Sequence, residues 1–163
     1  MSSPRVSIIT STYNRAQIVR RAIESVRAQT FTDWEHIIVG DCTPDDTEAV
    51  VRSFNDSRLR FFNLPEKSPP RSHGAIAKNH GILQMARGDY IAYLDDDDCY
   101  RPRFLEVMMG YVQAHPEAVL PTAERCTAIK RRAADYGAIR SSAGCTGTRG
   151  RSWNDTTSLT PIA

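Results

Sequence analysis

Four consecutive carboxylates, Asp95 to Asp98, directly follow a short apolar run at residues 91–94. The apolar run is typical of a buried strand, and in an open α/β sheet ligands bind where such strands end. Adjacent carboxylates repel one another unless a cation offsets their charge, and the oxygen-seeking ions Mg²⁺ and Mn²⁺ suit this role. Alternate side chains of an extended segment point the same way, so the run predicts a metal site built on an Asp-x-Asp pair. The competing interpretation is a solvated acidic loop, but the position after a core strand favours the metal site.

Polar side chains also follow two other expected strands. The segment Ser11 to Tyr13 comes after an expected strand at residues 6–10, and Asp41 comes after one at 35–39. A carboxylate such as Asp41 can accept a hydrogen bond from a pyrimidine N–H, and a tyrosine such as Tyr13 can stack on a base. These residue types are therefore able to bind a nucleotide base.

Lys78 lies in an expected helix that precedes the acidic run. Taken alone, it is typical of a solvated helix lysine. Next to a metal at Asp97, its ammonium would help to balance the charge of a diphosphate. His73 and His80 flank the start of the same helix and are typical of surface or capping residues.

Strands and helices alternate along the first 120 residues and form the scaffold for these side chains. Apolar and β-branched runs predict strands at residues 6–10, 35–39, 59–64, 91–94 and 118–120. Apolar residues at helical spacing predict helices at 16–28, after Asp45 and Asp46, at 75–86 and after Pro102. This alternation indicates an α/β fold with three layers, in which helices cover both faces of a mostly parallel sheet.

The segment before the acidic strand has its own signals. Residues 65–74 contain three prolines and predict a long irregular loop. In the helix at 75–86, the expected packing residues are Ile76, Ala77, Leu83 and Met85. Gly88 is expected to end this helix in the left-handed C′ position.

Length, charge and cysteine spacing exclude several classes of protein. The chain has 163 residues, one domain's worth, and a formal net charge of only +2, so it lacks the basic excess of a nucleic-acid-binding protein. The four cysteines show no C-x-x-C spacing, which indicates neither a zinc site nor a disulfide framework. No apolar run approaches the ~20 residues of a membrane span, and the N-terminus lacks the apolar core of a signal peptide. We therefore expect a cytoplasmic protein.

Three segments, taken together and in order, resemble a family 2 glycosyltransferase with the GT-A fold. They are VSIITSTYNR, AIESVRAQTFTDWEHIIVGDCTPDDTEAV and GAIAKNHGILQMARGDYIAYLDDDDCYRP, within about residues 4–120. The resemblance implies inverting transfer of a sugar from a nucleotide diphosphate donor, most frequently a UDP-sugar. It also implies a Rossmann-like GT-A domain at residues 1–120 and a cofactor of Mn²⁺ or Mg²⁺.

The same resemblance implies roles for individual residues. The donor nucleotide would be bound by Ser11, Thr12, Tyr13, Asp41, Lys78, Asp95 and Asp96, and the metal by Asp97 and Asp95. The pattern Leu-Asp-x-Asp-Asp favours the pair Asp95 and Asp97, although the pair Asp96 and Asp98 stays open. Two departures from the family are Gly40, where a second acidic residue is common, and Lys78, where arginine is usual.

Residues 121–163 differ in amino-acid composition from residues 1–120. They carry 7 basic and 3 acidic residues, and Ser, Thr, Gly, Ala and Arg dominate from Ser141 onward. We expect an atypical C-terminal segment that is partly disordered from Ser141, with a basic excess that could touch the acidic inner face of a membrane. No general base is identifiable in it: the carboxylates available are Glu124, Asp135 and Asp155.

Two functional hypotheses remain. The first is a metal-dependent transferase acting on a carbohydrate, lipid-linked or protein acceptor. The second is a truncated, non-catalytic module that binds the sugar nucleotide but lacks the usual C-terminal acceptor half and its base. A sugar-1-phosphate nucleotidyltransferase is set aside because its glycine-rich opening loop with arginine is missing. An incomplete sheet would expose an edge strand, so a homodimer is a further expectation.

Overall fold

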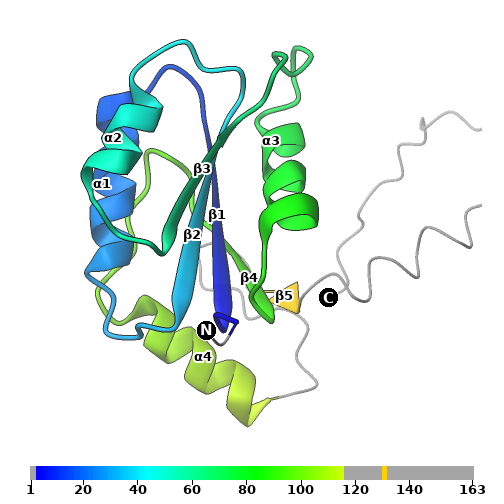
Figure 1. Ribbon diagram of the computed structural model, residues 1–163. Helices are drawn as coiled ribbons and strands as arrows, with labels where there is room; N and C mark the ends of the chain where they lie inside the picture. Colours follow the sequence, from blue (N-terminus) through cyan, green and yellow to red (C-terminus); the bar gives the residue numbers. More distant parts are fainter. Residues whose placement is uncertain (1–2, 116–129, 132–163) are drawn as a thin grey trace, which may run out of the picture.

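The computed structural model describes residues 3–115 and 130–131 (Figure 1). Within these residues one sheet has the strand order β3-β2-β1-β4-β5. Four strands are parallel: β1 (Val6–Thr12), β2 (Trp34–Gly40), β3 (Leu59–Asn63) and β4 (Tyr90–Tyr93). The fifth, β5 (Lys130–Arg131), is antiparallel to β4. The predicted α/β fold with a mostly parallel sheet is confirmed, whereas the expected strand at 118–120 and the expected disorder from Ser141 lie outside the described residues.

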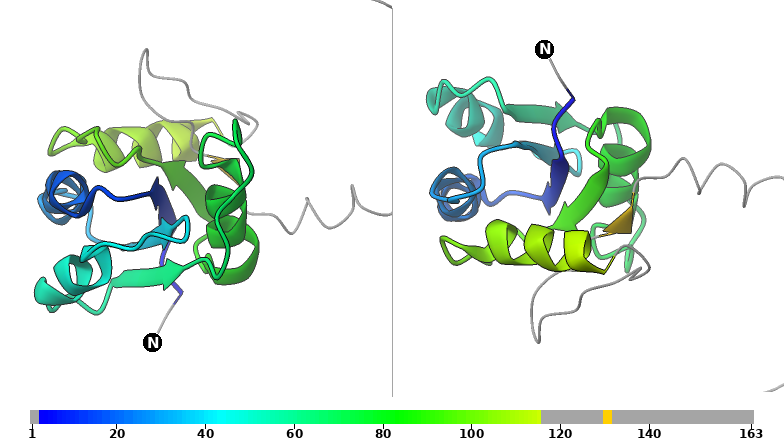
Figure 2. Two further views of the ribbon diagram at one scale, coloured as in Figure 1. Left: turned by 90° about the horizontal axis from the view of Figure 1, so that it is seen from above. Right: turned by 90° about the horizontal axis from the view of Figure 1, so that it is seen from below.

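Helices cover both faces of this sheet (Figure 2). On one face lie α1 (Ala16–Arg27), α2 (Thr47–Ser53) and α4 (Phe104–Ala114). On the other lie α3 (Ala75–His80) and the π-helical turn η1 (Gly81–Met85). Alternate residues of β1 divide between the two cores: Ile8 packs on the α1 and α4 side, and Ile9 on the α3 side. None of the helices in the described part of the chain is long and apolar enough to cross a membrane.

The order of the strands determines where a ligand can bind. From β1 the chain adds β2 and then β3 on one side, and then returns to place β4 on the other side of β1. The reversal between β1 and β4 leaves a crevice at their carboxyl ends, because the connections leave in opposite directions there. The residues that follow β1 and β4 are therefore neighbours in space.

The predicted helix at 75–86 is only partly correct. The α-helix ends at His80, and the Ala86 N–H then donates to the Gly81 carbonyl at 2.9 Å, five residues back. The expected packing of Ile76 and Leu83 is wrong, since these side chains are 44% and 49% exposed. The small residues Ala77 and Gly81 face the sheet instead, which lets the helix lie close to it.

Gly88 also differs from its prediction, because its backbone is not in the left-handed region. The residue is required for a close approach between chain segments. A Cβ atom at Gly88 would lie 2.6 Å from the backbone nitrogen of Ser7, and the Gly88 N–H donates to the Ser7 hydroxyl at 2.8 Å. The entry to β4 is therefore pressed directly against β1.

A buried hydrogen-bond network joins β1 and β2 to Leu94, the residue that follows β4. The Thr10 hydroxyl lies 2.8 Å from the Leu94 carbonyl and 2.9 Å from Nε2 of His36. A hydroxyl has one hydrogen, and Thr10 donates it to the carbonyl, so Nε2 of His36 must be the donor to Thr10. Complete burial lowers the pKa of His36 to about 3, and its imidazole is neutral at physiological pH.

The contact at Gly88 generates a prediction about stability. Gly88→Ala should lower the free energy of unfolding by about 2 kcal/mol or more, because the new methyl group would clash with rigid backbone. Gly110→Ala is the matched control, since a Cβ atom at Gly110 in α4 meets nothing within 4 Å. That substitution should raise stability by about 0.5–1 kcal/mol through the helix propensity of alanine. Urea unfolding measures both, and equal effects would contradict the proposed close packing at Gly88.

Candidate functional site

The eight side chains that the resemblance assigned to the nucleotide and the metal line one cleft of about 530 Å³, whereas Asp98, the open alternative, does not line it. They are Ser11, Thr12, Tyr13, Asp41, Lys78, Asp95, Asp96 and Asp97. The cleft lies where β1, β2 and β4 end, at the reversal in strand order. Its remaining lining comes from Arg15 and from the segment Lys67 to Gly74. The sequence thus placed these residues together correctly, while their individual roles stay predictions.

The four carboxylates form a turn in which alternate side chains differ in exposure. The Asp98 N–H donates to the Asp95 carbonyl at 3.1 Å. The side chains of Asp95 and Asp97 are 57% and 61% exposed, whereas that of Asp96 is 9% exposed. The carboxylate of Asp96 is therefore buried, whereas those of its neighbours Asp95 and Asp97 are exposed to solvent.

Asp96 connects the turn to the end of β1. One oxygen of its carboxylate accepts from the Thr12 hydroxyl at 2.8 Å, and the other accepts from the Arg15 guanidinium at 3.0 Å. The expected strand at 6–10 extends to Thr12, which is why the Thr12 side chain is buried and faces this carboxylate. Asp96 therefore has structural partners as well as a place in the cleft.

Two cations offset the charge of the acidic run. Besides its bond to Asp96, Arg15 lies 3.4 Å from Asp97, and the Lys78 ammonium lies 2.6 Å from Asp95. Within residues 3–115 and 130–131, no group of three or more acidic, His or Cys side chains is arranged to hold a metal ion. The exposed carboxylates of Asp95 and Asp97 still fit a hard cation whose other ligands are oxygens from outside the chain, which is the way Mg²⁺ is usually held beside a phosphate.

Asp41 is buried at the end of β2 and has three hydrogen-bond donors around it. Its Oδ1 accepts from the Ser68 N–H at 2.9 Å and the Ser68 hydroxyl at 2.5 Å, and its Oδ2 lies 3.1 Å from the Lys67 ammonium. Burial raises the pKa of Asp41, but the hydrogen bonds from Ser68 and the charge of Lys67 together lower it below its usual value. Asp41 is therefore an ionised carboxylate, which only accepts hydrogen bonds.

The sequence did not indicate Lys67, Ser68 or Arg15 as parts of the site. Lys67 and Ser68 belong to the loop between Leu64 and Gly74, where prolines obscure any periodic signal. This loop turns tightly at Arg71, His73 and Gly74, whose φ values are 69°, 47° and 74°. A Cβ atom at Gly74 would clash with the Ser11 hydroxyl, so this loop closes directly over the end of β1.

The carboxylate of Asp45 joins the starts of α1 and α2. It accepts from the Ala16 N–H at 2.9 Å and from the Thr47 hydroxyl at 2.6 Å. Burial raises the pKa of Asp45, but these hydrogen bonds, with that from Thr43, together lower it below its usual value. One carboxylate therefore accepts hydrogen bonds from the first residues of both α1 and α2.

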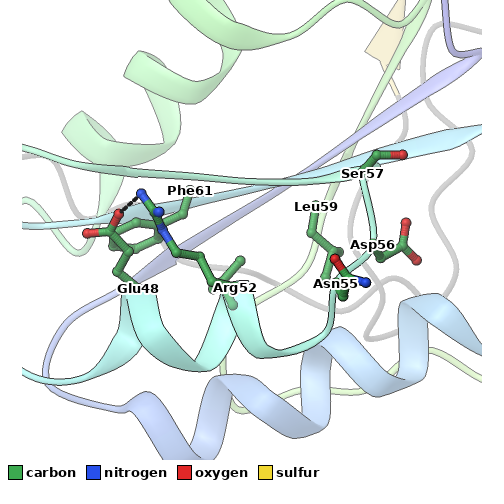
Figure 3. Close-up of a pocket in the computed structure, with 8 residues that line it drawn as sticks. Glu48, Arg52, Asn55, Asp56, Ser57, Leu59 and Phe61 are labelled. Carbon is green, nitrogen blue, oxygen red and sulfur yellow. Dashed lines mark hydrogen bonds and ion pairs between the residues drawn. The ribbon is translucent and has the colours of Figure 1, made fainter.

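A second hollow, of about 470 Å³, lies between α2 and the edge strand β3 (Figure 3). It contains the ion pair of Glu48 and Arg52, and its other labelled side chains include Asn55, Asp56 and Phe61. Two arginines contact its partly buried carboxylate: hydrogen bonds from Arg58, with the charge of Arg27, lower the pKa of Asp56 to about 2. None of the eight predicted site residues lies there.

Comparison with known proteins identifies relatives of the chain. The model of the family described as "Glycosyl transferase family 2" matches residues 7–158. The succinoglycan biosynthesis protein ExoO of Rhizobium meliloti is 40% identical over 111 residues, which is 68% of this chain and 30% of ExoO. The GalNAc(5)-diNAcBac-PP-undecaprenol beta-1,3-glucosyltransferase of Campylobacter jejuni is 38% identical over 98 residues, which is 58% of this chain and 30% of that enzyme.

Solved structures give the same result for the fold. A crystal structure of an S. aureus TarS fragment in complex with UDP superimposes with a TM-score of 0.62 and 25% identity. The superposition covers 69% of this chain and 33% of the TarS chain. The chain thus spans about a third of the length of each of these three chains.

The contacts of Asp96 predict a difference between neighbouring carboxylates. Asp96→Ala should lower the free energy of unfolding by about 2 kcal/mol, because it removes hydrogen bonds to a buried charged group and leaves Thr12 and Arg15 without them. Asp97→Ala, the matched control, should change stability by no more than about 0.5 kcal/mol, since its side chain is exposed. Denaturant unfolding at neutral pH compares the two. Equal stability of both variants would mean that Asp96 is not the connection between β1 and the turn.

Proposed function

The chain belongs to glycosyl transferase family 2, and on this basis we propose that its cleft binds the nucleotide diphosphate of a sugar donor for inverting transfer to an acceptor hydroxyl. The proposal rests on one observation: eight side chains, distant in sequence, line a single cleft at the ends of parallel strands. A UDP-sugar is the proposed donor. The UDP complex of the TarS fragment, which is 25% identical, supports this choice.

The proposed base-binding part of the cleft consists of Tyr13 and Asp41. Tyr13 is 44% exposed and offers a ring face on which a base can stack. Asp41 is ionised and only accepts, so it selects a base with a ring N–H, such as uracil, thymine or guanine. Ser11 and Thr12 would line the same pocket, and Asp95 and Asp96 would lie near the ribose.

The diphosphate would lie between Lys78 and the exposed carboxylates of Asp95 and Asp97. These two carboxylates would hold Mg²⁺ or Mn²⁺ together with diphosphate oxygens, and the ion would stabilise the charge that develops on the leaving group. Lys78 is within 2.6 Å of Asp95 and contributes a positive charge at the same place. As an ammonium, it acts as a point charge and lacks the bidentate geometry of arginine.

The proposed reaction also requires an acceptor hydroxyl and a general base. In an inverting transfer a base deprotonates the acceptor hydroxyl, which attacks the anomeric carbon in line with the leaving diphosphate. The acceptor that we propose is a saccharide, either lipid-linked or part of a polymer. The name of the Campylobacter jejuni relative, which specifies an undecaprenol-linked saccharide, supports this class.

A second candidate function is donor binding without transfer. One observation favours it: the carboxylates that line the described cleft are Asp41, Asp95, Asp96 and Asp97, and all have proposed roles with the nucleotide or the metal. No carboxylate of the described cleft is then left to act as the base. The two functions differ in whether donor binding leads to turnover.

Titration calorimetry tests donor binding. UDP, GDP and dTDP, each with and without Mn²⁺, should show metal-dependent binding of at least one nucleotide, and we expect UDP. Asp97→Ala should abolish the metal-dependent part of the affinity because it removes the exposed metal ligand. Asp98→Ala is the matched control, since this carboxylate does not line the cleft. Loss of metal dependence in the Asp98 variant alone would instead favour the pair Asp96 and Asp98.

Product release separates the enzyme from the binding module. With UDP-sugars, Mn²⁺ and saccharide acceptors, an enzyme should release UDP at a rate that depends on the acceptor, and Asp97→Ala should reduce that rate at least about 100-fold. If the protein binds UDP but releases no UDP from UDP-sugars, with or without acceptor, this result would support the binding module and exclude transfer by this chain.

A further inference from the structure

Lys67 contacts both side chains of the proposed base-binding part of the cleft. Its ammonium nitrogen lies 3.1 Å from Oδ2 of Asp41 and 2.8 Å from the centre of the Tyr13 ring. The first contact is an ion pair and the second a cation–π contact. One side chain therefore occupies the hydrogen-bond acceptor and the ring face that a base would use.

Ser68 contacts the same carboxylate in a different way. Its N–H and hydroxyl both donate to Oδ1 of Asp41, whereas the ion pair with Lys67 is made by Oδ2. A base that donates a ring N–H to Oδ2 of Asp41 would replace Lys67 and leave both bonds from Ser68 intact. The carboxylate would then stay in place during the exchange.

From these contacts we propose that Lys67 occupies the base-binding part of the cleft in the nucleotide-free protein and is displaced when a base binds. The inference rests on the proposed donor site and adds to it a residue that lowers nucleotide affinity. The ligand class is a nucleoside whose base carries a ring N–H. Such a base restores a hydrogen bond to Asp41 and a stacking partner to Tyr13 at the moment when Lys67 leaves.

The displacement of Lys67 has a modest energetic cost. Its side chain is 47% exposed, so its ammonium can return to water without moving the backbone. Ion pairs and cation–π contacts at exposed sites are weak, and they compete with a bound base without preventing it from entering. Lys67 should therefore reduce affinity several-fold.

Binding of uridine tests the proposal, because uridine has no phosphate and senses only the base and ribose contacts. Lys67→Ala should bind uridine about threefold to tenfold more tightly than the unaltered protein. Arg52→Ala is the matched control: it removes one positive charge from an exposed side chain on α2, outside the cleft, and should leave uridine affinity unchanged. Weaker or equal binding by the Lys67 variant would overturn the proposal.

NMR of methylated lysines gives a second, direct readout. The chain has three lysines, Lys67, Lys78 and Lys130, so ¹³C-dimethylation yields few signals, and Lys67→Ala identifies one of them. The Lys67 methyl protons should be shifted upfield by the Tyr13 ring and should lose this shift when uridine or UDP saturates the protein. An unshifted signal in the free protein, or one that keeps its shift at saturation, would overturn the proposal.

The two measurements also separate this inference from the proposed function. If neither the unaltered protein nor the Lys67 variant binds any nucleoside or nucleotide, the donor site itself is refuted and the inference falls with it. If both proteins bind UDP and the Lys67 variant binds uridine no better, only the role of Lys67 is refuted.

Discussion

The hydrogen-bonded carboxylate of Asp96 is the interaction on which the geometry of the cleft depends. It joins Thr12 at the end of β1 to the turn after β4, across the reversal in strand order. Four adjacent negative charges would otherwise push this turn away from the sheet. Arg15 on Asp96 and Lys78 on Asp95 offset that repulsion from the two sides of the crevice. The acidic run can therefore stay folded against the sheet before any ligand is bound.

The sequence predicted the four parallel strands, β1 to β4, and the gathering of the site residues because both depend on local patterns. Apolar runs define the strands, and residues that follow parallel strands, such as Tyr13, Asp41 and Asp97, must meet at one edge of the sheet. The outward-facing positions of α3 and η1 were not predicted, because Ile76 and Leu83 are apolar and yet exposed. Helical spacing gives a face but does not show that small residues will be the ones to contact the sheet.

The sequence did not predict the contacts that the loops make. Ser68 reaches Asp41, 27 residues away, and Asp45 reaches the N–H of Ala16, 29 residues away, through backbone paths that no periodicity encodes. The cleft consequently contains cations that already have partners: Arg15 with Asp96, Lys67 with Asp41 and Lys78 with Asp95. A charged donor would exchange partners with these residues and would not enter a cleft of unpaired charges.

The buried imidazole of His36, which is hydrogen-bonded to Thr10, makes unfolding a proton-binding reaction. The pKa of His36 is about 3 in the folded chain and 6.5 for an ordinary imidazole, so between these values the unfolded chain holds a proton that the folded chain lacks. The stabilisation from the neutral, buried ring is complete above pH 6.5 and decreases as the pH falls toward 3. At pH 5 the unfolding chain takes up about one proton from the buffer at this position. The measured heat of unfolding then includes the buffer's own heat of ionisation, and two buffers at the same pH give different enthalpies for the same structural change.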